Sequence, residues 1–418
     1  MTIKDSILEL ATRAKSGSAA LVSLSTDLKN MVLLDVADLL LKEKKLIKAE
    51  NNRDLKQAES KGLSRAMLDR LEITDGVIET MASGLHELST LPDPVGSIEN
   101  LKKRPNGLLV GRMRVPLGVI GMIYESRPNV TIDAAALCLK AGNSVILRGG
   151  SEAIYSNVTL TEIFKKALRA RRVVEDVIQI ISTTDRAAIN HLLTLENEID
   201  LIIPRGGEGL IRFVAENSRI PVLKHYRGVC HIYVDKDADF NKATAIILNS
   251  KIQRPGVCNA LEGLLIHEKI ADTFVNIIAE KLSAGGVKIK GCARSVAISS
   301  LVSKAEDDDW GTEFLDLTLC LKIVETFAEA RTYIRRYGSR HTESIITENY
   351  TTAQRFITEV DASAVMVNAA TRFNDGGQLG LGTEIGISTT KLHAYGPMGL
   401  EELTTRKFVV YGQGQVRM

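Results

Sequence analysis

The chain has 418 residues, of which 44% are hydrophobic and 25% charged, and its formal net charge is +2. This balance is typical of a globular protein with two or three domains. The 53 basic and 51 acidic residues nearly cancel, which argues against a nucleic acid or a membrane surface as the main partner. No apolar run approaches the roughly 18 residues needed to span a bilayer, and the charged N-terminal segment does not resemble a signal peptide. We therefore expect a cytoplasmic protein.

The first 90 residues are expected to form successive helices. Ser25, Thr26 and Asp27 offer N-caps before an apolar-periodic run, and Asn51 and Asn52 are expected to interrupt the helical pattern. The prolines of LPDPVGS, at 91–97, break the pattern and begin a connecting stretch.

From residue 106 the sequence changes to alternating strand-like and helix-like stretches. Apolar runs at 145–148 and 199–204 are separated by helical patterns at 152–169 and 185–195, and a second alternating block begins at 231. Strands separated by helices of roughly 10–15 residues indicate βαβ units and a mostly parallel sheet. The C-terminal segment KFVVYGQGQV is expected to be a strand.

Two glycine-containing turns follow predicted strands. Such a turn can bring backbone N–H groups and a helix N-terminus to a phosphate, but an ordinary glycine-rich turn is an open alternative. Arg148 ends its strand and would meet an anion there, although a solvated charge is the alternative. The residues of the two turns are Arg148, Gly149 and Ser151, and Arg205, Gly206 and Gly207.

The cysteines predict one candidate nucleophile. They show no CxxC pair, so neither a disulfide framework nor a zinc site is expected, and the histidines show no metal-ligand spacing, so we expect no metal. Four cysteines lie in apolar patterns or in an ordinary loop, namely Cys138, Cys230, Cys292 and Cys320. Cys258 instead lies in a proline–glycine turn, where Lys251 and Arg254 are close enough in sequence to favour a thiolate. A structural loop cysteine is the alternative.

The segment around Cys258, IQRPGVCNALEGLLIH, resembles the active-site segment of the γ-glutamyl phosphate reductase family. Long ungapped segments at 115–157, 336–348 and 384–405 resemble the same family, as does LPDPVG at 91–96. The resemblance extends from about residue 5 to 417 and places the chain in the aldehyde dehydrogenase superfamily.

This resemblance implies an α/β fold with two Rossmann-like domains and a small β-flap for oligomerisation. The implied NADP-binding domain takes in 1–105 and 117–228, with 385–406 returning to it. The implied catalytic domain takes in 229–384, and the implied flap takes in 106–116 and 407–417. A homo-oligomer, a dimer or a tetramer, is therefore expected.

The implied reaction is the reduction of L-glutamyl 5-phosphate by NADPH to glutamate 5-semialdehyde, on the way to proline. Cys258 would attack the acyl phosphate and expel phosphate, leaving a thioester that hydride reduces. Coupling to glutamate 5-kinase, which would supply the substrate, is also expected. Two alternatives are a hydrolytic aldehyde dehydrogenase and a non-catalytic relative that binds nucleotide or a partner enzyme.

The resemblance also assigns roles to individual residues. The Cys258 N–H and the Asn129 side chain are candidates for the oxyanion hole, although Asn129 as a helix N-cap remains an alternative. For the cofactor, the resemblance assigns the adenosine ribose to Arg148 with its Gly149–Ser151 turn, the pyrophosphate to Arg205, Gly206 and Gly207, and the nicotinamide ribose to Glu313. Arg254 and Arg372 are candidate clamps for the phosphate or the substrate carboxylate.

His225 is implied to replace the glutamate that hydrolytic relatives use as a general base. Counting back without gaps from Asp237 and Asp239 places His225 at that position, and Gly228 then matches a family glycine. His225 would contact the phosphate, or it is there only because it is no base for water. Either interpretation favours a reductase over a hydrolytic enzyme.

Overall fold

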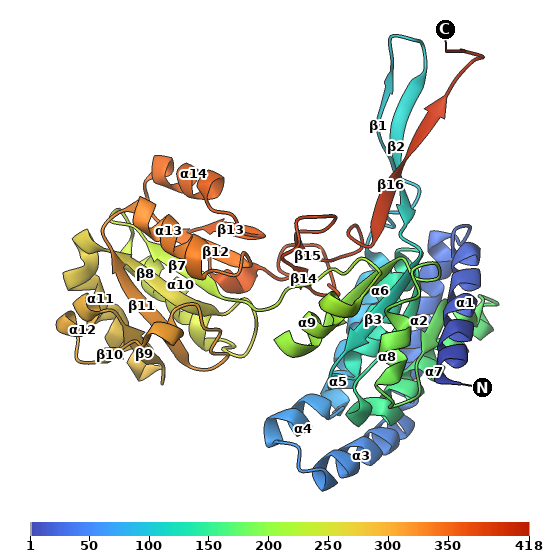
Figure 1. Ribbon diagram of the computed structural model, residues 1–418, viewed down its shortest axis with the longest axis horizontal. Helices are drawn as coiled ribbons and strands as arrows, with labels where there is room; N and C mark the ends of the chain where they lie inside the picture. The colour runs from blue at the N-terminus through green and yellow to red at the C-terminus, as the bar shows by residue number, and fades with distance from the viewer. Residues whose placement is uncertain (1, 418) are drawn as a thin grey trace. The chain divides into compact units, whose positions relative to one another are not determined.

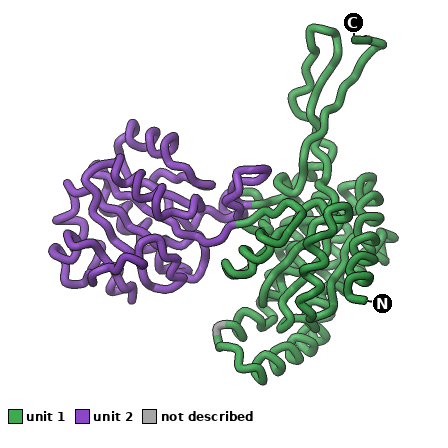
Figure 2. The backbone as a smooth tube through the Cα atoms, in the orientation of Figure 1, with its two compact units in different colours: residues 1–224, 380–386, 398–418 green, residues 225–379, 387–397 purple. Residues whose placement is uncertain are grey.

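The computed structural model describes residues 2–417, which fold into two compact units (Figure 2). Unit 1 comprises the described residues of 1–224, 380–386 and 398–418, and unit 2 comprises 225–379 and 387–397. The sequence placed the first boundary at 228/229 and the return at 385. The chain instead passes to unit 2 after Lys224 and returns to unit 1 at 380. The segment 387–397, which contains the β14–β15 ribbon, Ile387–Ser388 and Gly396–Pro397, belongs to unit 2 again.

Unit 1 begins with helices whose caps are readable in the sequence. The Ser25 side chain accepts the Leu28 N–H, and the Thr74 side chain accepts the Val77 N–H, so each begins its helix as an N-cap. The helices of this N-terminal part are α1 (Ile3–Leu21), α2 (Thr26–Lys42), α3 (Lys44–Ser60), α4 (Arg65–Leu71) and α5 (Asp75–Thr90).

The expected helix break at Asn51 and Asn52 is wrong, because α3 continues through both residues. The Asn51 amide is buried, donates to the Leu71 carbonyl at 2.9 Å, and accepts the Ile73 N–H at 2.8 Å. A residue with poor helix propensity is therefore retained because it satisfies the backbone of the segment between α4 and α5.

A four-stranded parallel sheet forms the centre of unit 1, in the order β5-β4-β3-β6. The chain runs from β3 to β4 and β5, and then returns to the other side of β3 with β6, which makes the β3/β6 boundary a topological switch point. The elements are β3 (Val119–Tyr124), α6 (Asn129–Lys140), β4 (Ser144–Arg148), η1 (Ser151–Ala153), α7 (Ile154–Ala170), η2 (Glu175–Val177), β5 (Ile178–Ile180), α8 (Ala187–Leu192), β6 (Leu201–Arg205) and α9 (Glu208–Asn217).

A separate three-stranded antiparallel sheet extends from unit 1 (Figure 1). Its order is β1-β2-β16, with bounds Ile98–Lys103, Leu109–Pro116 and Thr404–Tyr411. The pairing of β2 with the C-terminal β16 matches the expected flap, but β1 was assigned to the nucleotide-binding domain and lies in this sheet instead. The residues of β1 are mostly exposed, so its sequence carries no apolar alternation.

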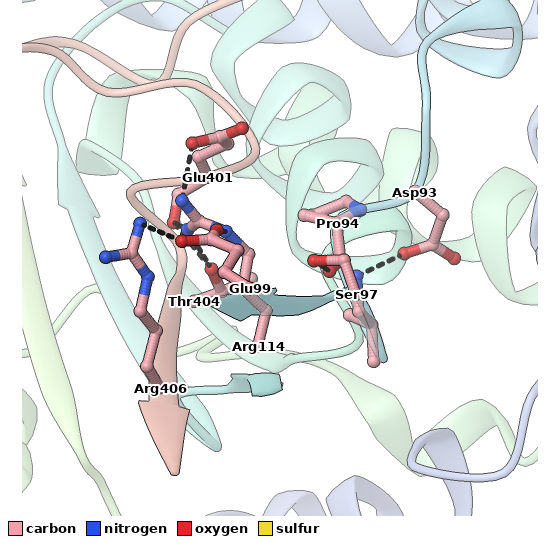
Figure 3. Close-up of polar contacts among 9 residues, drawn as sticks. Asp93, Pro94, Ser97, Glu99, Arg114, Glu401, Thr404 and Arg406 are labelled. Atoms are coloured by element: carbon pink, nitrogen blue, oxygen red, sulfur yellow. Dashed lines mark hydrogen bonds and ion pairs between the residues drawn. The ribbon is translucent and has the colours of Figure 1, made fainter. Parts of the chain in front are cut away.

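Arg114 of β2 joins the strands at the base of this sheet (Figure 3). Its guanidinium lies 3.2 Å from the Glu99 carboxylate of β1 and 2.6 Å from the Glu401 carboxylate, and it donates to the Thr404 hydroxyl at 3.1 Å. Arg406 binds the second oxygen of Glu99 at 3.2 Å. Arg114 is buried, and its charged bonds to partners from β1 and from the segment that leads into β16 fix the root of the sheet.

Unit 2 is built on a seven-stranded parallel sheet in the order β10-β9-β11-β8-β7-β12-β13. Its strands are β7 (Cys230–Val234), β8 (Leu261–His267), β9 (Lys288–Gly291), β10 (Val302–Lys304), β11 (Thr318–Val324), β12 (Thr342–Ile346) and β13 (Ala364–Val367). Its helices are α10 (Phe240–Ile252), α11 (Glu268–Ala284), α12 (Ala293–Ile298), η3 (Asp307–Asp309), α13 (Phe327–Tyr337), α14 (Tyr350–Glu359) and η4 (Thr371–Phe373). Apolar side chains of α10 and α11 pack against those of the sheet, including β8, to form a hydrophobic core.

None of the helices within residues 2–417 is both long and apolar enough to cross a membrane.

Candidate active site

The candidate nucleophile of unit 2 lies where the amino ends of several parallel strands meet. Gly228 precedes β7, Cys258 precedes β8, Glu313 precedes β11 and His341 immediately precedes β12. Because β11, β8, β7 and β12 are neighbours in that order, segments that are distant in sequence converge at one edge of the sheet. The sequence therefore builds this site from residues that directly precede apolar strands.

Cys258 is a half-buried free thiol in the turn between α10 and β8. The backbone of Gly228 packs directly on this turn, since a Cβ added to Gly228 would lie 1.9 Å from the Cys258 carbonyl oxygen. The buried Cys230 thiol donates to the same oxygen at 3.2 Å. Among residues 2–417 the Cys258 backbone N–H has no hydrogen-bond partner. It is therefore available to stabilise an oxyanion formed at the thiol.

Two arginines are associated with the Cys258 turn. Arg372 donates to the Gln253 amide oxygen at 2.9 Å and to the side-chain oxygen of Asn259, the residue after Cys258. Burial lowers the pKa of Arg372, and the nearby positive charge of Arg254 lowers it further. Arg254 itself is exposed. Because the two positive charges repel each other, an anion bound between them would stabilise both charged guanidinium groups.

His225 contacts this part of unit 2 through His341. Its ring meets the ring of the buried His341 edge-on at 5.8 Å, and the His341 Nδ1 lies 2.7 Å from the Thr342 hydroxyl and 3.7 Å from the Cys230 sulfur. Burial raises the pKa of the Cys230 thiol well above its usual value. Cys230 is therefore a protonated donor to the nucleophile turn, which agrees with its expected place in a buried strand.

Glu313 is connected to the nucleophile turn through Gly228. Its carboxylate accepts the Gly228 N–H at 2.9 Å, and Gly228 contacts the Cys258 backbone. Lys251, which the sequence suggested as a cation that favours the Cys258 thiolate, has another partner in the structure. The Lys251 ammonium is fully buried and binds the Glu262 carboxylate at 2.8 Å, because burial in an apolar strand layer requires a partner for the charge.

In unit 1 the two glycine turns lie at the carboxyl ends of β4 and β6, the two strands that flank β3. Arg148 ends β4 and pairs with Ile123 of β3, while Arg205 ends β6 and pairs with Tyr124. Ligands of open α/β sheets bind at this end of a switch point. The Gly207 N–H, at the start of α9, already holds an anion, since it donates to the Glu125 carboxylate at 3.0 Å.

The donor set of unit 1 fits a phosphate-bearing nucleotide. The Arg148 side chain is only 8% exposed, and its Nε has no hydrogen-bond partner among residues 2–417. One of its other nitrogens donates to the Gly149 carbonyl at 2.8 Å, and burial lowers the pKa of the guanidinium. A buried N–H without an acceptor lowers the stability of the fold, and a bound ligand could supply the missing acceptor. Ser151 follows in the first turn of η1.

Asn129 is the first residue of α6, with Pro128 as the N-cap, and no side chain caps the helix. The alternative of an Asn129 N-cap is therefore wrong. Its amide instead donates to the Asp133 carboxylate at 3.0 Å. Burial raises the pKa of Asp133 to about 6, opposed by the Asn129 hydrogen bond and by Arg205.

The sequence missed three polar groups of these sites. Glu125 was not singled out, although it directly follows β3 at the switch point. Asn259 and Glu262 are close to Cys258 in sequence. The pattern predicts only a turn residue at Asn259 and a single charged residue within an apolar strand at Glu262. Within residues 2–417, no group of three or more His, Cys, Asp or Glu residues is arranged to hold a metal ion.

The fold and the cysteine turn identify the class of protein. Residues 6–311 match the aldehyde dehydrogenase family, and the chain belongs to that family, which implies the use of NAD(P). The chain is 62% identical over 417 residues to a protein of Desulfotalea psychrophila named gamma-glutamyl phosphate reductase, and the alignment covers 100% of both chains. A protein of Desulfatibacillum aliphaticivorans with the same name is 57% identical, also over 100% of both chains. The crystal structure of gamma-glutamyl phosphate reductase from Thermotoga maritima has a TM-score of 0.96 at 45% identity, over 99% of this chain and 100% of that one.

Proposed function

We propose that this chain reduces L-glutamyl 5-phosphate to L-glutamate 5-semialdehyde with NADPH, as a step of proline biosynthesis. The observation that carries the proposal is the nucleophile turn. A half-buried cysteine with an available backbone N–H lies beside Arg254 and Arg372, in a chain that matches gamma-glutamyl phosphate reductases over their full length.

The covalent step fits these groups. The Cys258 thiolate attacks the acyl carbon, the bond from that carbon to the phosphate oxygen breaks, and phosphate leaves while a thioester forms. The Cys258 N–H would stabilise the oxyanion, with the Asn129 amide as the candidate second donor. Arg254 and Arg372 would bind the leaving phosphate or the substrate carboxylate. NADPH, when bound, supplies the hydride that reduces the thioester to the aldehyde.

For the cofactor we propose Arg148, Gly149 and Ser151 near the adenosine ribose and its 2′-phosphate. The unpartnered Nε of Arg148 supports this role, because a guanidinium offers two parallel donors to a phosphate. Arg205, Gly206 and Gly207 would bind the pyrophosphate, for which Glu125 would have to leave the Gly207 N–H. Glu313 would hold the nicotinamide ribose.

The proposed setting is the cytoplasm, with functional coupling to a glutamate 5-kinase, since an acyl phosphate is short-lived in water and must be used where it is made. A homo-oligomer formed through the β1-β2-β16 sheet is also proposed. Exposed Phe408, Val410 and Tyr411 on β16 support it.

The test is a coupled assay in which glutamate 5-kinase and ATP generate the acyl phosphate in situ and NADPH oxidation is followed. We expect NADPH consumption that requires kinase, ATP and glutamate together, with pyrroline-5-carboxylate as product. A wild-type protein that binds NADPH but consumes none under these conditions would refute the assignment. The Cys258→Ala variant is the matched control for background oxidation.

A further inference from the structure

A series of contacts in unit 2 leads from the nucleophile turn to the Glu313 segment and back to the strand that follows Cys258. Starting from Cys258, its backbone touches Gly228, whose N–H donates to Glu313. Two residues after Glu313, the Leu315 N–H donates to the Glu262 carboxylate at 3.3 Å. Glu262 is four residues beyond Cys258 on the same stretch of chain. The nucleophile turn and the Glu313 segment are therefore tied together at two points.

Glu262 is an unusual residue for its position. It is 1% exposed in β8, whose other residues are mostly apolar, and its second oxygen binds the buried Lys251 at the end of α10. The ion pair therefore joins the two ends of the segment 251–262, which carries Cys258. Burial raises the pKa of Glu262 to about 7, opposed chiefly by Lys251. A buried carboxylate is costly, so the position calls for a function beyond filling the core.

The backbone at Leu315 adds a reason for that carboxylate. Leu315 has φ +54°, in the left-handed region that a branched side chain rarely adopts. Its side chain is largely exposed, so core packing does not hold this conformation. The N–H of Leu315 donates to Glu262, which ties this backbone to β8, and Leu315 lies only two positions from Glu313.

We infer that Glu262 is a positioning residue that acts through the Leu315 N–H on Glu313 and, through Gly228, on the nucleophile turn. The inference rests on the proposed function, because it assigns Glu313 to the cofactor. Glu262 itself touches neither the cofactor nor the substrate. Lys251 compensates the charge of Glu262, and the two residues anchor the two ends of the segment that carries Cys258. Glu313 and Asp316 are the other charged groups facing the pair, and the Cys230 and Cys320 thiols lie nearby.

Two double variants separate positioning from stability. K251M/E262M replaces the ion pair with apolar residues of similar size, which leaves no unpaired buried charge and no acceptor for the Leu315 N–H. K251M/E262Q is also uncharged but keeps an acceptor for that N–H. The matched control is K29M/D93M in unit 1, where the buried Lys29 binds the Asp93 carboxylate at 2.8 Å. That carboxylate also accepts a backbone N–H, at 2.9 Å (Figure 3).

The readouts are the NADPH dissociation constant and the rate of Cys258 alkylation by iodoacetamide, followed by peptide mass spectrometry. We expect K251M/E262M to raise the NADPH dissociation constant about tenfold, as loss of one hydrogen bond to a charged group would, and to change the alkylation rate at least about threefold. K251M/E262Q should restore both values to within about threefold of wild type, and K29M/D93M should change neither.

A double-mutant cycle with Glu313→Gln completes the test. If Glu262 acts through Glu313, then K251M/E262M adds almost nothing to the cofactor affinity already lost in Glu313→Gln. Additive effects, or a K251M/E262M protein with wild-type cofactor affinity and alkylation rate, would overturn the inference. Neither readout requires acyl phosphate, so an inactive wild type would refute only the proposed function, whereas an active wild type with an additive cycle would refute only the role of Glu262.

Discussion

Gly228→Ala is expected to be the most damaging small substitution in unit 2. The added Cβ would lie 1.9 Å from the Cys258 carbonyl oxygen and 2.6 Å from its carbonyl carbon and Cα, whereas real Cβ contacts essentially never fall below 3.0 Å. Because the opposing atoms are backbone, no rotamer change relieves the clash. The nucleophile turn must therefore move by about 1 Å, and a displacement of that size can cost about 100-fold in rate.

The assay compares kcat in the kinase-coupled reaction with the melting temperature and the NADPH dissociation constant. Gly84→Ala is the control, because Gly84 lies within α5 and a Cβ there would have only an ordinary contact at 3.9 Å. We expect Gly84→Ala to stabilise the protein by about 0.5–1 kcal/mol with unchanged kcat. A folded Gly228→Ala protein with kcat within about threefold of wild type would refute the idea that this contact positions the thiol.

Three further predictions follow from single residues. Cys258→Ala and Cys258→Ser should abolish turnover while the melting temperature and NADPH binding are retained, and near-normal turnover by the alanine variant would exclude the covalent route. Arg148→Ala should lower the ratio of kcat/KM for NADPH over NADH by about tenfold or more, and an unchanged ratio would rule out Arg148 as the discriminating residue. Burial raises the pKa of Asp133 from 3.8 to about 6, so its stability contribution is complete below pH 3.8 and is lost as the pH rises through about 6. Asp133→Asn should therefore gain about 1–2 kcal/mol over wild type between pH 4 and 7, allowing for the partial exposure of the residue, and a pH-independent difference in chemical denaturation would contradict this.

The sequence predicted those elements whose identity is local. The strands β8 and β11 are almost entirely buried and are mostly apolar, with one charged exception each, Glu262 and Lys322. By contrast, β1 exists because it pairs with β2, and its exposed IENLKK carries no apolar pattern. Asn51 stays in a helix because of partners 20 and 22 residues away. In both cases a non-local contact overrides the local preference.

The candidate site divides in the same way. Cys258 could be predicted, because its proline–glycine turn before a strand distinguishes it locally from the cysteines that lie within apolar runs. Glu262 could not be predicted, because its partners, Lys251 and Leu315, lie 11 and 53 residues away and meet only in the folded sheet. Glu125 was missed for a similar reason, since the Gly207 N–H that it binds belongs to the turn after β6, 82 residues away, rather than to its own segment.

The final prediction concerns the fate of the thioester. Hydrolytic members of the family use a glutamate to activate water, and His225 is the residue expected at that position. Its ring contacts His341, whose Nδ1 lies 3.7 Å from the sulfur of Cys230, and an imidazole at position 225 would be more compatible with a phosphate dianion than a carboxylate would be. Oxidation of the semialdehyde should therefore require added phosphate and yield acyl phosphate, trapped as the hydroxamate.

His225→Glu should weaken the phosphate-dependent reaction at least about tenfold, because it places a negative charge where the phosphate enters, and should introduce measurable release of free glutamate. His225→Gln, which adds no charge, is the matched control and should keep most of the phosphate dependence. NADP⁺ reduction by the wild type at an equal rate without phosphate would instead show that water reaches the thioester, and the hydrolytic assignment would then replace the reductive one. The phosphate KM of His225→Gln separates the two interpretations of His225. If His225 binds phosphate, the substitution raises this KM, whereas if His225 only takes the place of the glutamate, the KM stays unchanged.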